Sequence, residues 1–246
     1  MATETVYTSP ARVKALLPRS YSTTDLPDSS DSSLVSLATL SIDVSRVIDS
    51  RIGDVYCSFN SWNHATYPTP RKIIDIASKG TAGRALRQLG LGDRNVGSAV
   101  RAVGYEGEFD VALAAMRGDA QPGADAVSLP LETVTTETLT FGTGALYGLQ
   151  SYEAFFSVTD YVTTGDIPTM VEESVRVLTS GLTNYRFGTD FVIEFRPEYQ
   201  KWVFVDATGA LAASGSAKTV TYKFDWKRHA QRPASANAAP MYLGVW

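Results

Sequence analysis

The sequence has few residues of the kinds that form disulfides, bind metals or catalyse reactions. A single cysteine, Cys57, excludes a disulfide within the chain and indicates synthesis in a reducing compartment such as a cytoplasm. Only two histidines occur, His64 and His229, and we expect them in separate regions, with His64 in a loop and His229 in a C-terminal tail. No spacing typical of a zinc site, a P-loop or a hydrolase nucleophile is present. We therefore expect no cofactor, no metal and no enzymatic activity.

Excess positive charge and long apolar runs are lacking as well. Lysine and arginine number 22 against 26 aspartates and glutamates, which gives a formal net charge of -4. Proteins that grip nucleic acid across many phosphates usually have a basic surplus, so we expect no tight DNA binding. No uncharged apolar stretch approaches the length of a bilayer span, and the first residues do not resemble a signal peptide. We expect neither a membrane segment nor secretion.

Apolar residues recur at helical spacing in the first half of the chain. We expect a short helix after Ser9, because Pro10 then occupies the favoured first turn. A long amphipathic helix is predicted to begin at Asp31 or a neighbouring serine and to run to about Val55.

Two further helices are predicted with less regular patterns. Pro70 is expected to open a third helix, whose middle is weakened by Gly80 and Gly83. A last helix is predicted over residues 109–116, before a glycine that favours a helix end. Residues 90–107, between these helices, are rich in glycine and less clear, and one interpretation is a frayed helix between the glycines.

Residues 131–226 alternate in the manner of β-strands and are rich in Thr, Val, Tyr and Phe. The clearest unit is a β-hairpin, with strands 191–195 and 201–205 joined by a longer turn. The full set of predicted strands is 132–141, 152–158, 174–178, 191–195, 202–206 and 218–226. The sequence thus predicts an α+β protein: an N-terminal α-helical bundle, then a small antiparallel β-sandwich or barrel domain, then an extended C-terminal arm.

We expect a helical domain at 1–128, a β domain at 129–226 and an arm at 227–246. The arm contains basic residues and no acid, and it ends in large apolar side chains that would be costly to leave in water. We therefore expect the arm to bind a partner. Its candidate binding residues are Lys227, Arg228, Arg232, Met241, Tyr242, Leu243 and Trp246.

The helical half resembles the head-tail connector, or adaptor, proteins of long-tailed bacteriophages. The pattern has four pieces in order. A tyrosine and a short helix come first, and a long helix follows that contains a small residue and Ile-Asp and is followed by a tyrosine. A proline then precedes an Ile-rich helix, and the last helix ends in an apolar residue, any residue and glycine. The residues that carry it are Tyr7, Val13 to Leu17, Ser45, Ile48, Asp49, Ile52, Tyr56, Pro70, Ile73, Ile76, Ala77, Met116 and Gly118. The stretch between Gly80 and Gly107 departs from the pattern.

The β half resembles a small domain that is appended to phage head-tail and tail proteins. Its pattern is Gly-x-Asp-aromatic-apolar, a turn, an apolar strand and a Val-x-Tyr strand. Here these read Gly188-Thr-Asp-Phe-Val192, Trp202-Val-Phe-Val205 and Val220-Thr-Tyr222. Together the two resemblances cover most of the chain.

The resemblance implies a structural protein of the virion neck, made in the host cytoplasm. It implies a ring of twelve copies beneath the portal protein, which extends the DNA channel and offers a platform to the next neck or tail protein. DNA would pass through without specific binding. The C-terminal arm would reach the portal. We expect ring contacts on the outward side of the long helix, at Arg46, Asp49, Arg51 and Asp54, because this side carries both charge signs.

Three alternatives stay open. Another neck component, such as a stopper or tail-completion protein, is disfavoured by the helical half, because such proteins are mainly β. A carbohydrate-binding virion module would need exposed, coplanar aromatic side chains in the β half. A small enzyme would need a catalytic set that the sequence does not show.

Overall fold

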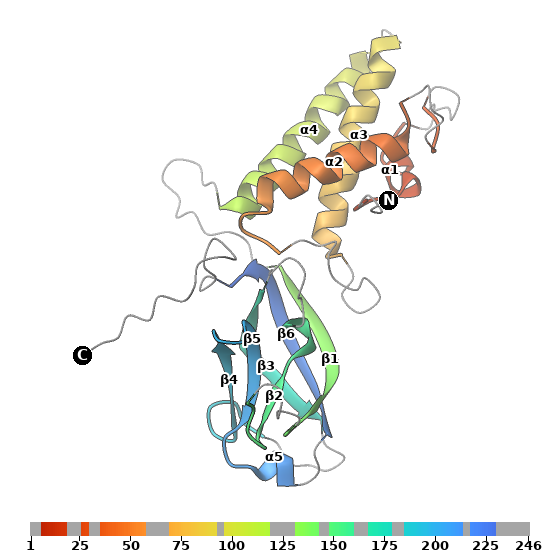
Figure 1. Ribbon diagram of the computed structural model, residues 1–246. Coiled ribbons are helices and arrows are strands. Elements are labelled where there is room, and N and C mark those ends of the chain that lie inside the picture. The colour runs from red at the N-terminus through yellow and green to blue at the C-terminus, as the bar shows by residue number, and fades with distance from the viewer. Residues whose placement is uncertain are drawn as a thin grey trace, which may run out of the picture. The chain divides into compact units, whose positions relative to one another are not determined.

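The computed structural model describes residues 6–18, 26–29, 35–57, 69–92, 96–118, 131–142, 148–159, 167–178, 185–213 and 217–229. The chain divides into two compact units, residues 1–129 and 130–246. Helices α1 to α4 lie in the first unit and antiparallel strands in the second (Figure 1). The protein is therefore a mixed α+β protein in which helices precede antiparallel sheets, as the sequence predicts.

Serine caps open the first two helices. Helix α1 (Pro10–Lys14) begins after Ser9, whose side chain accepts a hydrogen bond from the backbone N–H of Arg12, so the predicted start is confirmed. Helix α2 (Leu37–Ile52) begins after Ser36, whose Oγ accepts from the N–H of Thr39 at 3.1 Å. The cap suggested by the sequence, Asp31, lies outside the described residues.

Helices α3 (Arg71–Gly92) and α4 (Val96–Arg117) each have 22 residues and pack on one another. A Cβ at Gly80 would lie 2.6 Å from Cδ2 of Phe109, and one at Gly83 would lie 2.9 Å from Cγ of Glu106. These glycines let the two helices approach closely, which offsets their low helix propensity. The prediction of a short last helix over 109–116 was wrong, because the glycine-rich residues before it belong to α4.

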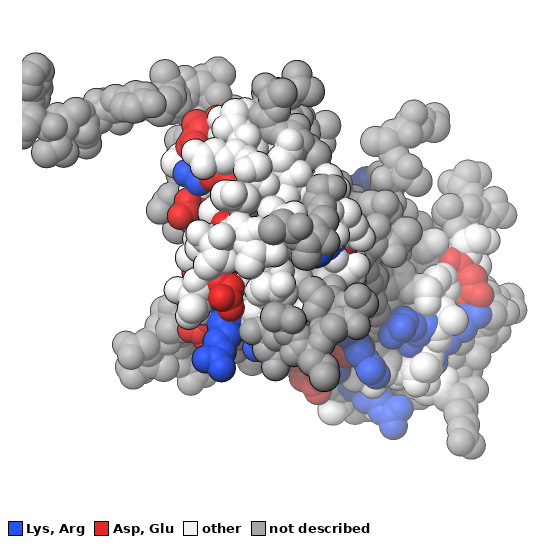
Figure 2. Space-filling model, turned by 90° about the horizontal axis from the view of Figure 1, so that it is seen from below, with Lys and Arg blue, Asp and Glu red and all other residues white. Residues whose placement is uncertain are grey.

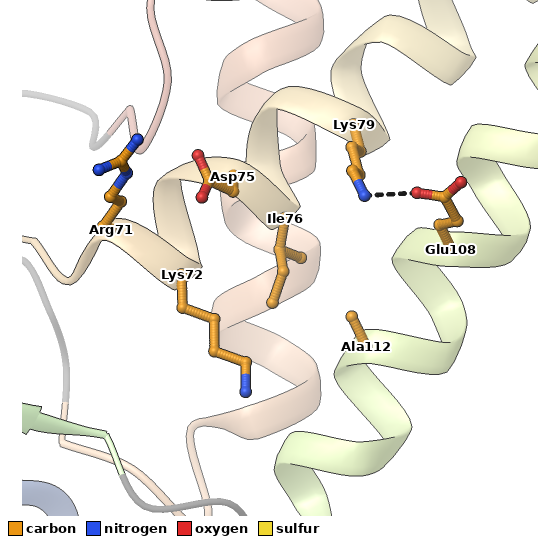
Figure 3. A pocket seen from close by; sticks show the side chains of 7 residues that line it. All are labelled: Arg71, Lys72, Asp75, Ile76, Lys79, Glu108 and Ala112. Atoms are coloured by element: carbon orange, nitrogen blue, oxygen red, sulfur yellow. Dashed lines mark hydrogen bonds and ion pairs between the residues drawn. The ribbon is translucent and has the colours of Figure 1, made fainter.

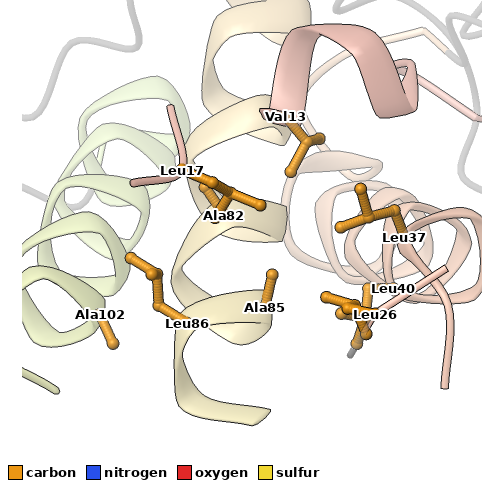
Figure 4. Close-up of a cluster of buried hydrophobic side chains, with 9 residues drawn as sticks. All are labelled: Val13, Leu17, Leu26, Leu37, Leu40, Ala82, Ala85, Leu86 and Ala102. Carbon is orange, nitrogen blue, oxygen red and sulfur yellow. The ribbon is translucent and has the colours of Figure 1, made fainter. Parts of the chain in front are cut away.

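A cluster of buried aliphatic side chains joins the helices of this unit (Figure 4). It contains Val13, Leu17, Leu26, Leu37, Leu40, Ala82, Ala85, Leu86 and Ala102. The contributing residues come from α1, α2, α3, α4 and the segments that follow α1. Helices α3 and α4 contribute mainly alanines to the cluster, and leucines from α2 and from the segments after α1 fill the space beside them.

The second unit contains two three-stranded antiparallel sheets. Strand β6 is central in the first sheet, which has the order β1-β6-β3, and β5 is central in the second, β2-β5-β4. The strands are β1 (Glu132–Thr140), β2 (Glu153–Phe155), β3 (Pro168–Leu178), β4 (Phe191–Arg196), β5 (Lys201–Asp206) and β6 (Ala217–Arg228). Two short helices, η1 (Ser157–Thr159) and α5 (Ala210–Ala213), follow β2 and β5.

The predicted hairpin is confirmed, because β4 pairs with β5 from Phe191–Asp206 to Arg196–Lys201. Strand β3 begins six residues before the predicted Ser174. Its alternation is interrupted by a register shift between Val171 and Arg176, which hides the first part of the strand from a simple pattern.

Aromatic side chains fill the interior of the second unit. Phe156 contacts both Phe204 of β5 and Tyr222 of β6, at ring-centroid distances of 6.1 and 4.7 Å. Along β6, Tyr222, Phe224 and Trp226 recur at every second position and are fully buried. This period of two places one face of β6 in the core.

Candidate binding surfaces

Ionisable groups that could ligate or catalyse are dispersed. Within the described ranges, no three or more His, Cys, Asp or Glu side chains group as a metal ion would need. None of the helices described there has the length and apolar composition needed to cross a bilayer. Glu172 and Glu173 form the acidic pair that stands out in the sequence; burial first, and then the charge of Glu173, raise the pKa of Glu172.

Three of the four proposed ring-contact residues are exposed: Arg46 and Arg51 of α2, and Asp54, which lies just beyond the end of α2 at Ile52. Arg51 forms a 2.6 Å ion pair with Asp110 of α4, and Asp54 lies 3.4 Å from Arg117. Arg46 lies 3.5 Å from Asp43, one turn earlier in the same helix. Charges of both signs are therefore exposed along α2 and just after it, but Arg51 and Asp54 already form ion pairs with α4 of their own chain.

The expectation that Asp49 faces outward was wrong. Its carboxylate accepts a hydrogen bond from the hydroxyl of Tyr7 and is partly buried. Burial raises the pKa of Asp49, and the hydrogen bond from Tyr7 opposes this shift. Because Tyr7 precedes Asp49 by 42 residues, helical periodicity within α2 could not reveal the contact.

An open groove of about 300 Å³ lies between α3 and α4 (Figure 3). Arg71, Lys72 and Asp75 line it at the start of α3, and Lys79 forms an ion pair with Glu108 of α4 across it. The groove thus presents charges of both signs and contains no Ser, Thr, Cys or His. Such a lining suits electrostatic contact with another surface more than nucleophilic or acid–base chemistry.

Acidic and basic side chains are both present on the molecular face that Figure 2 shows, with uncharged residues between them. This mixture agrees with the nearly balanced composition of 22 basic and 26 acidic residues.

The two basic residues that open the predicted arm belong instead to strand β6. Arg228 pairs with Pro168 of β3, and Nζ of Lys227 lies 4.0 Å from Asp225. The strand extends two residues beyond the predicted end because β3 begins earlier and supplies a partner. Its arginine and lysine are not apolar, so the sequence pattern alone ends at Trp226.

His229 also belongs to the β unit and not to a tail. Its backbone N–H donates to the carbonyl of Ile167 at 2.8 Å. The centroid of its ring lies 4.2 Å from the ring centroid of Phe195 and 4.7 Å from that of Trp202. The remaining proposed portal-binding residues, Arg232, Met241, Tyr242, Leu243 and Trp246, lie outside the described residues, as does His64.

The outward side of α4 is an apolar surface that the sequence reasoning missed. Val100, Val103 and Val111 are 67%, 64% and 71% exposed, and open space surrounds the Cα atoms of Gly104 and Gly107. The signal in the sequence is the spacing of Val100, Gly104, Gly107 and Val111, which recur at intervals of four, three and four residues. It was missed because the glycines in residues 90–107 weaken the helical pattern, so that at most a frayed helix was expected there. Contiguous exposed apolar surface is typical of protein-binding faces.

Comparison of the chain with protein-family models, curated proteins and solved structures finds no match.

Proposed function

We propose that this protein is a head-to-tail adaptor of a tailed-phage virion. In this role, twelve copies form a ring in the neck, between the portal protein and the next neck or tail protein. The ring extends the DNA channel, and DNA passes through it without specific binding. The role requires no cofactor, no turnover and no membrane, and every copy acts through contacts with other proteins.

The observation that carries the proposal is that the motif residues of the resemblance bind one another. The backbone N–H of Tyr7 donates to Oγ of Ser45 at 3.0 Å, and its hydroxyl donates to Asp49. The hydroxyl of Tyr56 donates to the carbonyl of Met116 at 2.9 Å. Motif pieces far apart in the sequence are thus joined by buried or partly buried hydrogen bonds, which supports reading them as one structural signature.

The finer architecture is part of the proposal. The buried cluster shared by all four helices supports an α-helical bundle in the first unit. The contacts of Phe156 with both Phe204 and Tyr222 join the two sheets and support a sandwich or barrel in the second. The residues that line the groove between α3 and α4 include no Ser, Thr, Cys or His, whereas the outward face of α4 exposes apolar side chains suited to protein contact.

The portal contact is assigned to the chain after β6. Arg232 supplies positive charge there, and Met241, Tyr242, Leu243 and Trp246 supply apolar surface of the type that dominates binding energy at interfaces. A weak contact repeated around a ring gives a firm joint through avidity. Lys227 and Arg228 lie in β6, so their part in portal binding is limited to steering at the strand end.

Imaging of virions that carry a tag on this chain tests the proposal. A closed ring at the portal vertex is the expected result. Density for the tag further down the neck would favour a stopper or tail-completion protein, and tag density away from the neck would refute the role.

Deletion of residues 240–246 tests the portal contact separately. The truncated chain should keep the circular dichroism of the full chain and lose co-purification with the portal. A chain with Met241, Tyr242, Leu243 and Trp246 reordered within the same segment controls for composition. Truncated protein that co-purifies at the level of the full chain would rule the contact out.

A further inference from the structure

The outward face of α4 has the spacing of a coiled-coil seam. Its residues recur at alternating intervals of three and four, the a and d positions of a heptad repeat. They are Gly97, Val100, Gly104, Gly107, Val111 and Ala114. Over four turns of helix this face presents glycine, alanine and valine and no polar side chain, although a solvated helix face is normally polar.

The glycines of α3 and the glycines of the α4 seam differ in whether packing within the chain requires them. Gly80 and Gly83 of α3 are required by close packing on α4, because a Cβ there would lie within 3.0 Å of Phe109 or Glu106. At Gly104 and Gly107 nothing lies within 4 Å of an added Cβ. Each of these two glycines costs about 1 kcal/mol relative to alanine in a helix. Nothing among their described neighbours accounts for this cost, whereas a close external contact would.

The order of side chains along the seam identifies the occupant. Read from either end, the seam is nearly the same: Gly, Val, Gly, then Gly, Val, Ala. An antiparallel copy of α4 would therefore place Gly104 opposite Gly107 and Val100 opposite Val111, each pair occurring twice. A surface that is complementary to its own reversed copy is the requirement for a two-fold contact between identical chains.

The charges that flank the seam favour the same arrangement. Arg101 and Glu108 lie one heptad apart on one flank, and in an antiparallel helix pair residues of the same flank meet. Arg101 of each copy would then lie beside Glu108 of the other, where it would join the ion pair that Glu108 forms with Lys79 of its own chain. Arg101 is exposed and has no ion-pair partner among the described residues of its own chain. A parallel pair would instead bring Val103 near Glu108, with no complementary charge.

We propose that α4 pairs with α4 of a second copy in an antiparallel, two-fold contact whose centre lies between Gly104 and Gly107. The inference does not rest on the adaptor role, because a two-fold contact closes as a pair, while a ring needs two different surfaces in contact. One helix pair buries less than the about 1,200 Å² of standard stable interfaces, so the association is reversible and depends on concentration.

Light scattering or sedimentation of the full chain over a range of concentrations tests the contact. The mass should rise toward twice the 26.6 kDa of one chain. The double variant Gly104→Glu/Gly107→Glu should raise the dissociation constant at least about tenfold, because carboxylates would face one another in a dry seam. Its thermal stability should not fall, because both positions are open in the single chain and glutamate favours helix.

The matched control adds two carboxylates elsewhere on the same unit. Ser50 of α2 and Gln88 of α3 are exposed, so Ser50→Glu/Gln88→Glu should leave the dissociation constant unchanged. The proposal is overturned if the chain stays monomeric at every concentration. An assembly whose mass the glycine variant does not change would overturn it as well.

Disulfide trapping tests the orientation. In the antiparallel pair, residue 104 of one copy lies opposite residue 107 of the other, whereas two copies of residue 104 are separated by about 4.5 Å more along the axis. A mixture of Gly104→Cys and Gly107→Cys chains should therefore give linked dimers, and each variant alone should give few. The native Cys57 is buried and common to all samples. Preferential linking within one variant would refute the antiparallel arrangement.

Discussion

Buried hydroxyl groups of the helical unit differ in whether they have a hydrogen-bond partner. Oγ1 of Thr8 lies 2.6 Å from Oγ of Ser78, whereas Oγ1 of Thr81 is buried and has no partner among the described residues. Because an unsatisfied buried hydroxyl costs about 1–3 kcal/mol, we expect Thr81→Val to raise the free energy of unfolding by about 1 kcal/mol. Urea unfolding measures this change.

The matched control is Thr8→Val, which makes the same replacement of a hydroxyl by a methyl group at a position where the hydroxyl is hydrogen-bonded. We expect it to lower the free energy of unfolding by about 1 kcal/mol, because the hydroxyl of Ser78 loses a partner. Equal changes in the free energy of unfolding for the two substitutions would show that the hydrogen bond of Thr8 does not distinguish it energetically from Thr81.

The carboxylate of Asp49 gives stability a dependence on pH. Burial raises its pKa in the folded protein above that in the unfolded chain. The folded state therefore holds the proton more tightly, so this contribution is fully present below the unfolded pKa and is lost as pH rises through the folded pKa. Asp49→Asn does not titrate. We expect the variant to gain stability relative to the original chain between pH 4 and pH 7.

Urea unfolding of both chains at the two pH values measures this difference. Asp43, on the same helix, has a more exposed carboxylate, so Asp43→Asn controls for the loss of one negative charge from α2. A difference between the chains that stays constant with pH would contradict the assignment to Asp49.

At the level of elements, glycines in helices α3 and α4 have opposite effects on stability. Gly80→Ala adds a Cβ that would lie 2.6 Å from Phe109, so we expect it to lower the free energy of unfolding by about 1–3 kcal/mol despite the better helix propensity. Gly104→Ala adds a Cβ in open space and should raise it by about 1 kcal/mol.

Both variants are compared by thermal unfolding at low protein concentration, where pairing of α4 does not contribute. Stabilisation by both substitutions would show that α3 and α4 do not approach as closely at Gly80 as described. Destabilisation by both would contradict the open environment of Gly104.

The sequence predicts some elements better than others, and the differences have physical causes. Helix α1 and the β4–β5 hairpin are predicted correctly, because caps, prolines and alternation act over a few residues. The first three turns of α4 are missed, because the close approach of Ala102 and Glu106 to Gly83 of α3 outweighs local propensity. The inward position of Asp49 is missed because its partner, Tyr7, is distant in sequence. Local rules therefore give the elements, and long-range contacts decide their extent and orientation.

At the level of the whole molecule, the balance of charge predicts weak interaction with DNA. The formal net charge of -4 repels the phosphate backbone on average, and acidic and basic residues are mixed on the face in Figure 2. We expect no submicromolar binding of the purified chain to duplex DNA at physiological salt. Fluorescence anisotropy with labelled duplexes measures this. Tight binding with a steep salt dependence would contradict a passive conduit.

The division into two compact units predicts two thermal transitions. Each unit has its own buried core: Leu86 belongs to the aliphatic cluster of the first, and Phe204 belongs to the aromatic interior of the second. Leu86→Ala should lower only the transition temperature of the helical unit, and Phe204→Ala only that of the β unit. Each should lower the free energy of unfolding of its unit by about 2–5 kcal/mol, the cost of truncating a large buried side chain. Differential scanning calorimetry resolves the two transitions, and far-ultraviolet circular dichroism assigns the helical one. If either substitution shifts a single common transition, the two units unfold as one, and the separate-core description fails.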